Sequence, residues 1–215
     1  MRVGIFGGTF DPLHLGHLIL AEQCREQGRL DQLWFVPSPR PPHKSDRTLT
    51  RFDQRVEMLQ LAIAGQSSFR VEEIEKDRPG PSYTVDTVAE LRQRHPAHEF
   101  FLLLGSDTLA DIHTWYEPAR LLALVGLLVM TRPGHPVRTA EQIRASLLLP
   151  ESTPVRVEQI ASPLIDISSR ELRARAAAGR SLRYLVPRAV EVFVREKHLY
   201  QTAALLKSES MGTAT

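Results

Sequence analysis

The chain has 215 residues, of which 42% are hydrophobic and 24% are charged, and its formal net charge is +2. These values suit one α/β domain with a well-formed core, and nothing in them demands a nucleic-acid or a membrane partner. The single cysteine, Cys24, excludes an internal disulfide and a cysteine metal cluster.

Targeting and membrane signals are absent from the sequence. The amino terminus runs directly into an apolar segment without a signal-peptide pattern, and no apolar run approaches the roughly 20 residues that cross a bilayer. The longest run, Leu121 to Met130, suits a helix end that leads into a buried strand. We therefore expect a cytoplasmic protein, and a homo-oligomer stays open.

The first expected elements are a strand and a helix joined by a tight turn. Val3 to Phe6 form a short apolar run that stops at Gly7 and Gly8, and a helical pattern begins near Leu15. This order is typical of the opening of a βαβ unit. Ligands gather where such a strand ends and the helix begins, because unpaired N–H groups and the helix dipole favour an anion there.

Two histidines lie at this point in the sequence. His14 and His17 are three residues apart, so on a helix both imidazoles would share a face and point at one phosphate chain. Gly16, between them, has no side chain to keep a ligand away. Taken separately, each glycine is ordinary in a turn and each histidine is ordinary as a cap or a surface residue. Together they predict a nucleotide-phosphate site.

The second strand, Leu33 to Val36, argues against a dehydrogenase. In dinucleotide-binding dehydrogenases this strand ends in an acidic residue and the first turn carries GxGxxG, and both features are missing. The proline-rich segment from Ser38 to Lys44 follows instead. It is either a solvated loop or a semi-rigid arm that brings the Lys44 ammonium to a phosphate.

A helix is expected over Phe52 to Ala64 and a peripheral strand over Phe69 to Ile74. After a turn-rich loop, Ser82 or Thr84 is expected to cap a helix whose inward face contains Val85, Val88 and Leu91. The hydroxyl groups either only cap this helix, or the helix start also binds a carboxylate or phosphate through backbone N–H groups.

The apolar run from Phe100 to Leu104 is typical of a central parallel strand. Asp107 follows at its carboxyl end and either binds a ribose or a metal or caps the next helix. Trp115 is either a core residue or a stacking partner for a flat ring. A further strand is expected over Val125 to Met130, and Arg132 after it could meet an adenine or a phosphate.

The last third of the chain is expected to contain a peripheral helix over Ala140 to Leu149, a short strand over Val155 to Ile160, and two further helices. Ser168 and Glu171 have the spacing of a capping box. Ser169 and Arg173 are four apart and share a helix face, so both could meet one anion. The final helix is expected over Val186 to Leu199 with Pro187 at its start, and residues 202–215 as a flexible tail.

The segment GGTFDPLHLGH resembles the T/HxGH fingerprint of the nucleotidyltransferase superfamily, and its form GGTFDPxHxGH resembles bacterial nicotinate-nucleotide adenylyltransferases in particular. The resemblance continues through PPHK, SYTxDT, GSDxLxxxHxWY and ISSxxxR. It implies an α/β fold, a Rossmann-like doubly wound parallel sheet flanked by helices. A single domain over 1–201 is implied, with a small C-terminal helical part from about residue 168. Arg170 and Leu172 depart from the usual family residues, but neither is an implied ligand contact.

The resemblance also implies the roles of individual residues. The implied catalytic residues are His14, His17, Lys44 and Arg173. ATP would be bound by Gly7, Gly8, Thr9, Phe10, His14, Gly16, His17, Gly105, Asp107, Arg132, Ile167, Ser168, Ser169 and Arg173. The acceptor would be bound by Thr9, Lys44, Ser82, Tyr83, Thr84, Trp115 and Arg132.

The implied reaction is transfer of AMP from ATP to nicotinate mononucleotide, which gives deamido-NAD and pyrophosphate. The acceptor phosphate is already ionised, so alignment and charge stabilisation suffice and no general base is expected. Mg²⁺ is expected to come with ATP, without a dedicated set of protein ligands. Three alternatives stay open: an adenylyl- or cytidylyltransferase with another phosphorylated acceptor, a non-catalytic nucleotide sensor, and the disfavoured dehydrogenase.

Overall fold

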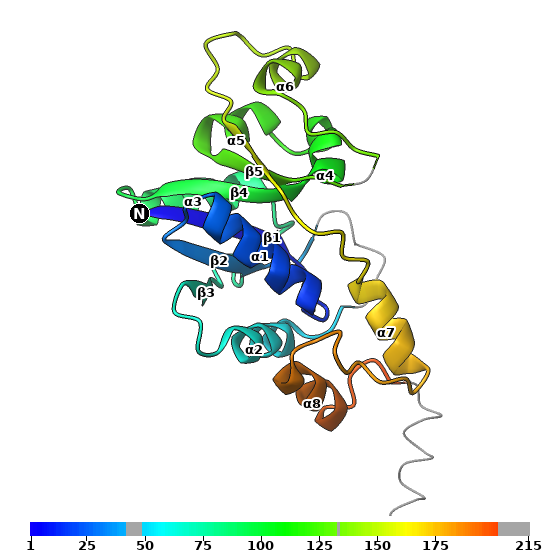
Figure 1. The fold of residues 1–215 in the computed structure, drawn as a ribbon. Coiled ribbons are helices and arrows are strands. Elements are labelled where there is room, and N and C mark those ends of the chain that lie inside the picture. Colours follow the sequence, from blue (N-terminus) through cyan, green and yellow to red (C-terminus); the bar gives the residue numbers. More distant parts are fainter. Residues whose placement is uncertain (42–48, 133, 202–215) are drawn as a thin grey trace, which may run out of the picture.

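The structure, a computed structural model, describes residues 1–41, 49–132 and 134–201. Lys44 and the predicted tail over 202–215 lie outside the described residues. The described part of the chain alternates strands with helices (Figure 1). The strands are β1 (Arg2–Gly8), β2 (Gln32–Pro37), β3 (Phe69–Val71), β4 (Glu99–Gly105), β5 (Gly126–Met130) and β6 (Val157–Ile160). The helices are α1 (Leu15–Gln27), α2 (Phe52–Ile63), α3 (Thr84–Arg94), α4 (Ser106–Ala110), the short 3₁₀ helix η1 (Ile112–Thr114), α5 (Pro118–Leu124), α6 (Ala140–Ser146), α7 (Ser169–Ala177) and α8 (Arg188–Glu196).

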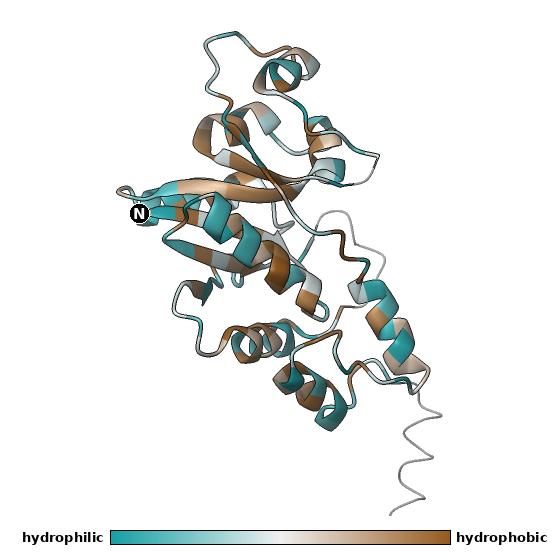
Figure 2. Cartoon of the chain, viewed as in Figure 1, coloured by the Kyte–Doolittle hydropathy of each residue, from teal (hydrophilic) through white to brown (hydrophobic). Residues whose placement is uncertain are grey.

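The strands form one six-stranded parallel sheet in the order β3-β2-β1-β4-β5-β6. Side chains alternate between its two faces because successive residues of a strand point in opposite directions. Ile5 and Leu102 pack with residues of α3, α4, α5 and α6, whereas Phe6 and Phe101 pack with residues of α1 and α2. The predicted Rossmann-like doubly wound α/β fold is therefore confirmed, and Figure 2 shows its hydrophobic strands between helices with hydrophilic outer faces.

The two strands at the centre of the sheet separate at their carboxyl ends. Pairing between β1 and β4 stops at Ile5 and Leu102, whereas β1 stays paired with β2, and β4 with β5, to the last residue of each. The strand order reverses at this point, with β2 on one side and β5 on the other. Open α/β sheets bind ligands at such a switch point, so the topology itself predicts a site between β1 and β4.

The C-terminal helices form a third hydrophobic cluster at one side of the sheet. Leu172 of α7 and Phe193 of α8 pack with Met58 of α2. Figure 1 shows α7 and α8 beyond the amino end of α1, next to α2. This packing brings a late part of the sequence against the loop between β1 and α1.

Several predicted element boundaries were wrong. The strand expected over Phe69 to Ile74 has only the three residues of β3, because it lies at the sheet edge and pairs with β2 alone. The helix expected to Leu149 ends at Ser146, and the last helix ends at Glu196 with Pro187 as its N-cap. Tyr83, rather than Ser82 or Thr84, is the N-cap of α3, and no side-chain bond to the helix start is found there.

Candidate functional site

The loop between β1 and α1 is held in an uncommon backbone conformation. Phe10 has a φ of 47°, which bulky residues rarely adopt. Its buried ring packs edge-on against Phe6 and Phe35, with both centroids 5.6 Å away. A Cβ on Gly8 would lie 3.0 Å from this ring, whereas a Cβ on Gly7 would meet nothing within 4 Å. Gly8 therefore makes room for Phe10, and Gly7 leaves open space beside the loop.

His14 and His17 form a reciprocal pair at the start of α1. His14 is the N-cap: its Nδ1 accepts a bond from the His17 backbone N–H, and His17 Nδ1 accepts one from the His14 backbone N–H, at 3.3 and 3.2 Å. The two rings stack with centroids 3.6 Å apart. Because each Nδ1 is an acceptor, a neutral ring carries its proton on Nε2. The predicted pair is confirmed as an adjacent pair, with His14 capping the helix rather than lying within it.

His14 is 6% exposed, and its surroundings favour the neutral imidazole. Burial first, and then the charge of Arg132, lower the pKa of His14 to about 4 from the ordinary 6.5. At neutral pH the ring is therefore a neutral hydrogen-bond donor through Nε2. The free protein therefore supports a hydrogen-bond donor rather than an imidazolium at this position.

The depressed pKa of His14 predicts a pH-dependent stability. The unfolded chain binds a proton at His14 below about pH 6.5 whereas the folded protein does so only near pH 4, so stability is complete above 6.5 and falls between these values. The full loss is about 3 kcal/mol. Urea unfolding from pH 7 to 4 is expected to show this loss in the wild type relative to His14→Gln, which cannot titrate. Parallel pH profiles for the two proteins would contradict this assignment.

Gly16 lies against the same imidazole. A Cβ at this position would be 3.0 Å from His14 Nδ1 and 3.3 Å from Cγ2 of Ile165. Glycine at this position therefore allows the His14 ring to seat between α1 and the segment that precedes α7. Ile165 has no such role in the sequence-based prediction, since nothing in the sequence near it indicates a contact with the first helix.

α7 reaches the loop before His14. The Ser169 hydroxyl donates to the carbonyl of Pro12 at 2.9 Å, and Arg173 Nη1 donates to the carbonyl of Asp11 at 2.5 Å. Ser168 caps the helix by accepting from the backbone N–H of Glu171, which is half of the predicted capping box. The prediction that Arg173 and the histidines belong to one region is therefore supported by contacts, although the Ser169 hydroxyl contacts the loop itself. Ile167, before the cap, packs in the C-terminal cluster.

The ends of β4 and β5 bring a second set of predicted residues together. A Cβ on Gly105 would lie 2.2 Å from Oδ1 of Asp107 and 3.5 Å from Nε of Arg132. The backbone N–H of Arg132 donates to the Ser106 hydroxyl at 2.8 Å. Since the charge of Arg132 also acts on His14, this set lies beside the histidine pair.

A pocket of about 510 Å³ opens where β1 and β4 separate. We call it the switch-point pocket. Its walls include Thr9 from the first loop, and aromatic side chains from the segments before α3 and after η1. Tyr83 and Tyr116 stack there with ring centroids 4.4 Å apart. The predicted residues that line it are Gly7, Gly8, Thr9, Ser82, Tyr83, Thr84 and Trp115.

The sequence analysis also missed other residues that line the switch-point pocket, among them the polar Ser38, Glu75, Thr87 and Thr114 and the aromatic Tyr116. Glu75 is 6% exposed and accepts a bond from the Thr87 hydroxyl at 2.6 Å. Burial raises the pKa of its carboxyl group. The expected strand over Phe69 to Ile74 stopped one residue short of Glu75, so no sequence pattern placed this acid in the site.

The sequence analysis also missed Arg55 of α2, which holds the loop between β1 and α1 through hydrogen bonds. It is 1% exposed, and it donates to the carbonyls of Thr9, Ser38 and Thr50 at 2.7, 2.9 and 3.0 Å. Burial lowers the pKa of this guanidinium, and the charge of Asp11 opposes that shift. A signal existed in the sequence, because Arg55 falls on the helix face of Leu59 and would be an unusual cation in a core position.

Known proteins are similar to this chain in sequence and in fold. The family described as "Cytidylyltransferase-like" matches residues 5–175. A protein of Exiguobacterium sibiricum is 42% identical over 202 residues, covering 94% of this chain and all of the relative. One of Thermus thermophilus is 44% identical over 201 residues, again covering 94% of this chain and all of the relative. Both are named "Probable nicotinate-nucleotide adenylyltransferase".

A solved structure agrees at the level of the fold. The Plasmodium falciparum nicotinic acid mononucleotide adenylyltransferase complexed with NaAD superposes with a TM-score of 0.74. It is 21% identical, and the match covers 93% of this chain and 97% of that one. The chain therefore belongs to the cytidylyltransferase-like family and, within it, to the nicotinate-nucleotide adenylyltransferases.

Proposed function

We propose that this protein transfers AMP from ATP to nicotinate mononucleotide and releases deamido-NAD and pyrophosphate, a reaction of NAD biosynthesis. The observation that carries the proposal is the switch-point pocket, which joins the phosphate-binding loop at Thr9 to the aromatic residues Tyr83, Trp115 and Tyr116. The stacked histidine pair follows this loop, at the start of α1. The end of the pocket at Thr9 suits phosphates, and the end at the aromatic residues suits a flat pyridine ring.

In this proposal the protein acts by alignment and by stabilising charge on phosphorus-bound oxygens. The acceptor phosphate attacks the α-phosphorus of ATP, a new P–O bond forms, and the bond to the β-phosphate oxygen breaks with pyrophosphate as the leaving group. The Nε2–H groups of His14 and His17 donate to the oxygens on which charge grows. These donors are held in place before the reaction, so no reorganisation is needed at that moment.

The remaining phosphate contacts are proposed from position and charge. Arg132, whose charge already acts on His14, and Arg173, which reaches the same loop, would bind ATP phosphates. The start of α7 at Ser168 and Ser169 supplies backbone N–H groups for the leaving pyrophosphate. Asp107 would bind a ribose hydroxyl group. Lys44 keeps its predicted role at the acceptor phosphate, although it lies outside the described residues.

Mg²⁺ fits this proposal as a companion of ATP. In the described ranges, no group of three or more His, Cys, Asp and Glu residues could hold a metal ion. Mg²⁺ prefers to keep several water molecules and to bind substrate phosphates, so it does not need such a group. Bound to the triphosphate, it would neutralise part of the charge that the histidines and arginines also offset.

The start of α3 favours an acceptor with a carboxylate. Since no side-chain bond to this helix start is found among the described residues, the first N–H groups after Tyr83 are available to an anion. Ser82 and Thr84 line the pocket beside them. Nicotinate carries a carboxylate at its ring whereas nicotinamide carries an amide, so this helix start supports nicotinate mononucleotide as the acceptor.

Trp115→Ala is expected to raise KM for nicotinate mononucleotide about tenfold, because stacking on an aromatic side chain contributes on the order of 1–3 kcal/mol. KM for ATP is expected to stay close to the wild-type value. Steady-state kinetics with each substrate varied in turn measures both constants. Tyr184→Ala is a matched control, since that ring is 79% exposed on the C-terminal part. An unchanged acceptor KM in Trp115→Ala would remove this side chain from the proposed acceptor site.

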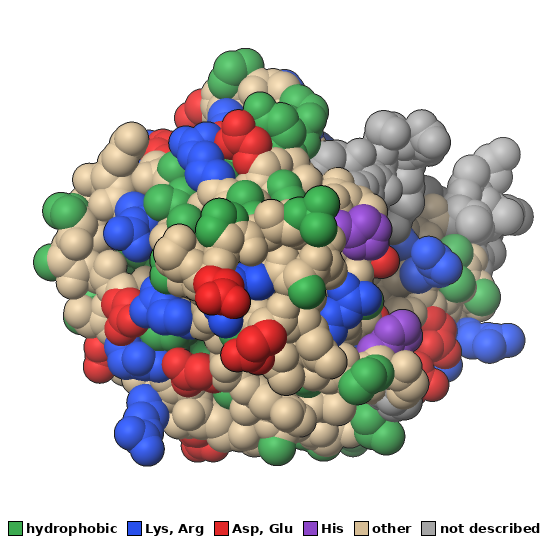
Figure 3. All heavy atoms as spheres, turned by 90° about the horizontal axis from the view of Figure 1, so that it is seen from above, with side chains coloured by type: hydrophobic (Ala, Val, Ile, Leu, Met, Phe, Trp, Pro, Cys, Tyr) green, Lys and Arg blue, Asp and Glu red, His purple; other side chains and the backbone are tan. Residues whose placement is uncertain are grey.

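The partners in the proposal are small molecules in the cytoplasm. Figure 3 shows basic and acidic side chains interspersed on the face seen from above, a distribution that suits small phosphorylated substrates as well as any larger partner. None of the helices in the described part of the chain has the length and apolar character needed to span a bilayer. A homo-oligomer is compatible with the proposal.

The proposed function is tested by offering the purified protein ATP or CTP with nicotinate mononucleotide, nicotinamide mononucleotide or phosphopantetheine in turn. Pyrophosphate release and the adenylylated or cytidylylated product are measured together. We expect deamido-NAD from ATP and nicotinate mononucleotide at the highest kcat/KM. Another pair at a higher kcat/KM would replace the proposed acceptor or donor, and binding of ATP without product from any pair would favour a nucleotide sensor.

A further inference from the structure

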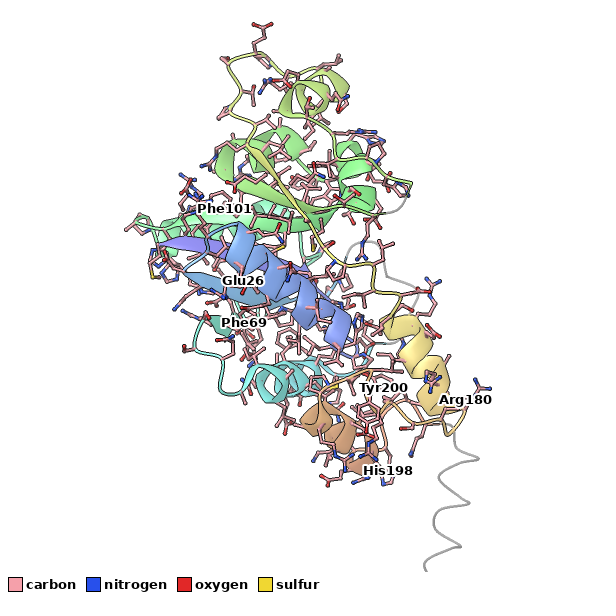
Figure 4. The ribbon with its side chains drawn as sticks, viewed as in Figure 1. Glu26, Phe69, Phe101, Arg180, His198 and Tyr200 are labelled. Atoms are coloured by element: carbon pink, nitrogen blue, oxygen red, sulfur yellow. The ribbon has the colours of Figure 1, made fainter. Side chains whose placement is uncertain are left out.

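Tyr200, near the end of the described chain, reaches the loop between β1 and α1. Its hydroxyl donates a hydrogen bond to Oδ1 of Asp11 at 2.8 Å, across 189 residues of sequence. Burial, assisted by the charge of Asp11, raises the pKa of Tyr200, so the hydroxyl stays a donor throughout the neutral range. Figure 4 places Tyr200 between α7 and α8, on the side of these helices that is turned to α1.

Besides Tyr200, two other parts of the fold meet the loop at Asp11. It is 1% exposed, and its backbone carbonyl accepts a bond from Arg173 of α7. The Arg55 guanidinium of α2 is near enough for the charges of Asp11 and Tyr200 to act on it. The C-terminal part touches the loop once more beyond His14, where the backbone N–H of Leu15 donates to the carbonyl of Leu185 at 3.0 Å.

The loop conformation needs such anchors. Phe10 has a positive φ, a strained conformation for a bulky residue that persists only where the surroundings hold it. Arg55 holds the residue before Phe10, and Tyr200 holds the residue after it. His14 follows Asp11 by three residues and depends on the direction in which this loop enters α1.

We propose that Tyr200 is a positioning residue for the paired histidines, and that it acts through its hydrogen bond to Asp11. The C-terminal segment thereby holds the loop in the conformation that points His14 and His17 at the phosphates. Tyr200 itself is assigned no contact with substrate. The expected change in kcat rests on the proposed function, whereas the expected effect on the loop and on His14 does not.

Tyr200→Phe removes only the hydroxyl and keeps the packing of the ring. We expect kcat to fall about fivefold, which is the effect of one hydrogen bond of ordinary strength. KM for ATP and for the acceptor is expected to stay close to the wild-type value, because no substrate contact is lost. Tyr184→Phe, at a tyrosine that is 79% exposed, is the matched control and should behave as the wild type.

A double-mutant cycle tests whether the effect passes through Asp11. In an Asp11→Ala background, Tyr200→Phe is expected to lower kcat less than it does in the wild type, because the bond to Asp11 is already gone and the contact of the hydroxyl with the Thr50 side chain remains. In an Asp11→Asn background, where an oxygen remains to accept the bond, Tyr200→Phe should still lower kcat. A wild-type kcat in Tyr200→Phe, or an equal fold-loss in the wild-type and Asp11→Ala backgrounds, would overturn the proposal.

A second readout is independent of turnover. The pKa of His14, measured by NMR titration of the free protein, is expected to rise from about 4 toward 6.5 in Tyr200→Phe as the ring becomes accessible to water. An unchanged pKa would overturn the positioning role, whereas absence of adenylyl transfer by the wild type would overturn only the proposed function. If Tyr200→Phe does not fold, Asp11→Asn is expected to retain more activity than Asp11→Ala, and equal losses would overturn the proposal.

Discussion

Replacing His17 with alanine is expected to lower kcat by about two to three orders of magnitude, the usual effect of removing one preorganised donor from a developing oxyanion. The His17 ring stacks on His14 at 3.6 Å and offers Nε2–H from a fixed position. KM for ATP should change little, because the arginines proposed at the phosphates remain. Single-turnover and steady-state kinetics measure the two effects.

Two measurements separate this loss from a loss of structure. His17 also takes part in the cap of α1, and loss of this cap lowers the free energy of unfolding by about 1 kcal/mol. Thermal unfolding therefore measures the folded fraction of the variant, and kcat is calculated per folded molecule. His113→Ala removes an exposed histidine from η1 and should leave kcat unchanged. A kcat in His17→Ala within the range of this control would rule out the assigned role.

The second large effect is expected on stability. Arg55→Ala should lower the free energy of unfolding by about 3–5 kcal/mol, since it removes a buried cation and leaves three carbonyl groups without their donor. Asp11 would also lose a compensating charge. Urea unfolding monitored by tryptophan fluorescence measures the change.

The matched control for Arg55→Ala is Arg51→Ala. Arg51 precedes the same helix, and its side chain is 78% exposed with a surface ion pair to Asp53. Such pairs contribute about 0–1 kcal/mol, so this variant should unfold nearly as the wild type does. Equal destabilisation by the two substitutions would mean that the buried hydrogen bonds of Arg55 do not stabilise the loop.

Local patterns in the sequence predicted most of the sheet. The apolar runs Val3 to Phe6 and Phe100 to Leu104 are buried parallel strands, as predicted from their short length and uninterrupted apolar character. The predicted length of the edge strand β3 was too great, since an edge strand pairs on one side only and the hydrophobic pattern of this one is weak. The grouping of Tyr83, Thr84 and Trp115 in one pocket agrees with the resemblance to the family, although their contacts with a substrate stay predictions.

Long-range contacts could not be predicted from local patterns. The Ser169 hydroxyl and Tyr200 both bond to the loop before His14 from more than 150 residues away. No periodicity connects such positions. The resemblance at ISSxxxR implied a shared ligand for Ser169 and His14, but the contacts with the loop depend on how α7 and α8 pack against α2. Arg55 is the intermediate case, since its place on a core helix face marks it as unusual but does not name its partners.

The pKa shifts of buried groups also could not be predicted without the fold. The sequence alone does not specify the charge state of His14, because its lowered pKa follows from burial together with a charge from Arg132 after β5. The raised pKa of Glu75 arises in the same way, from desolvation at the carboxyl end of the sheet. Both shifts depend on elements that are distant in sequence and adjacent in space.

A crystal structure with a non-hydrolysable ATP analogue and nicotinate mononucleotide would test the central claim most directly. We expect the α-phosphate within hydrogen-bond distance of Nε2 of His14 and His17, the β- and γ-phosphates at Arg173 and the start of α7, and the pyridine ring in the switch-point pocket. A triphosphate bound away from the histidines, or a pyridine ring outside that pocket, would contradict the account.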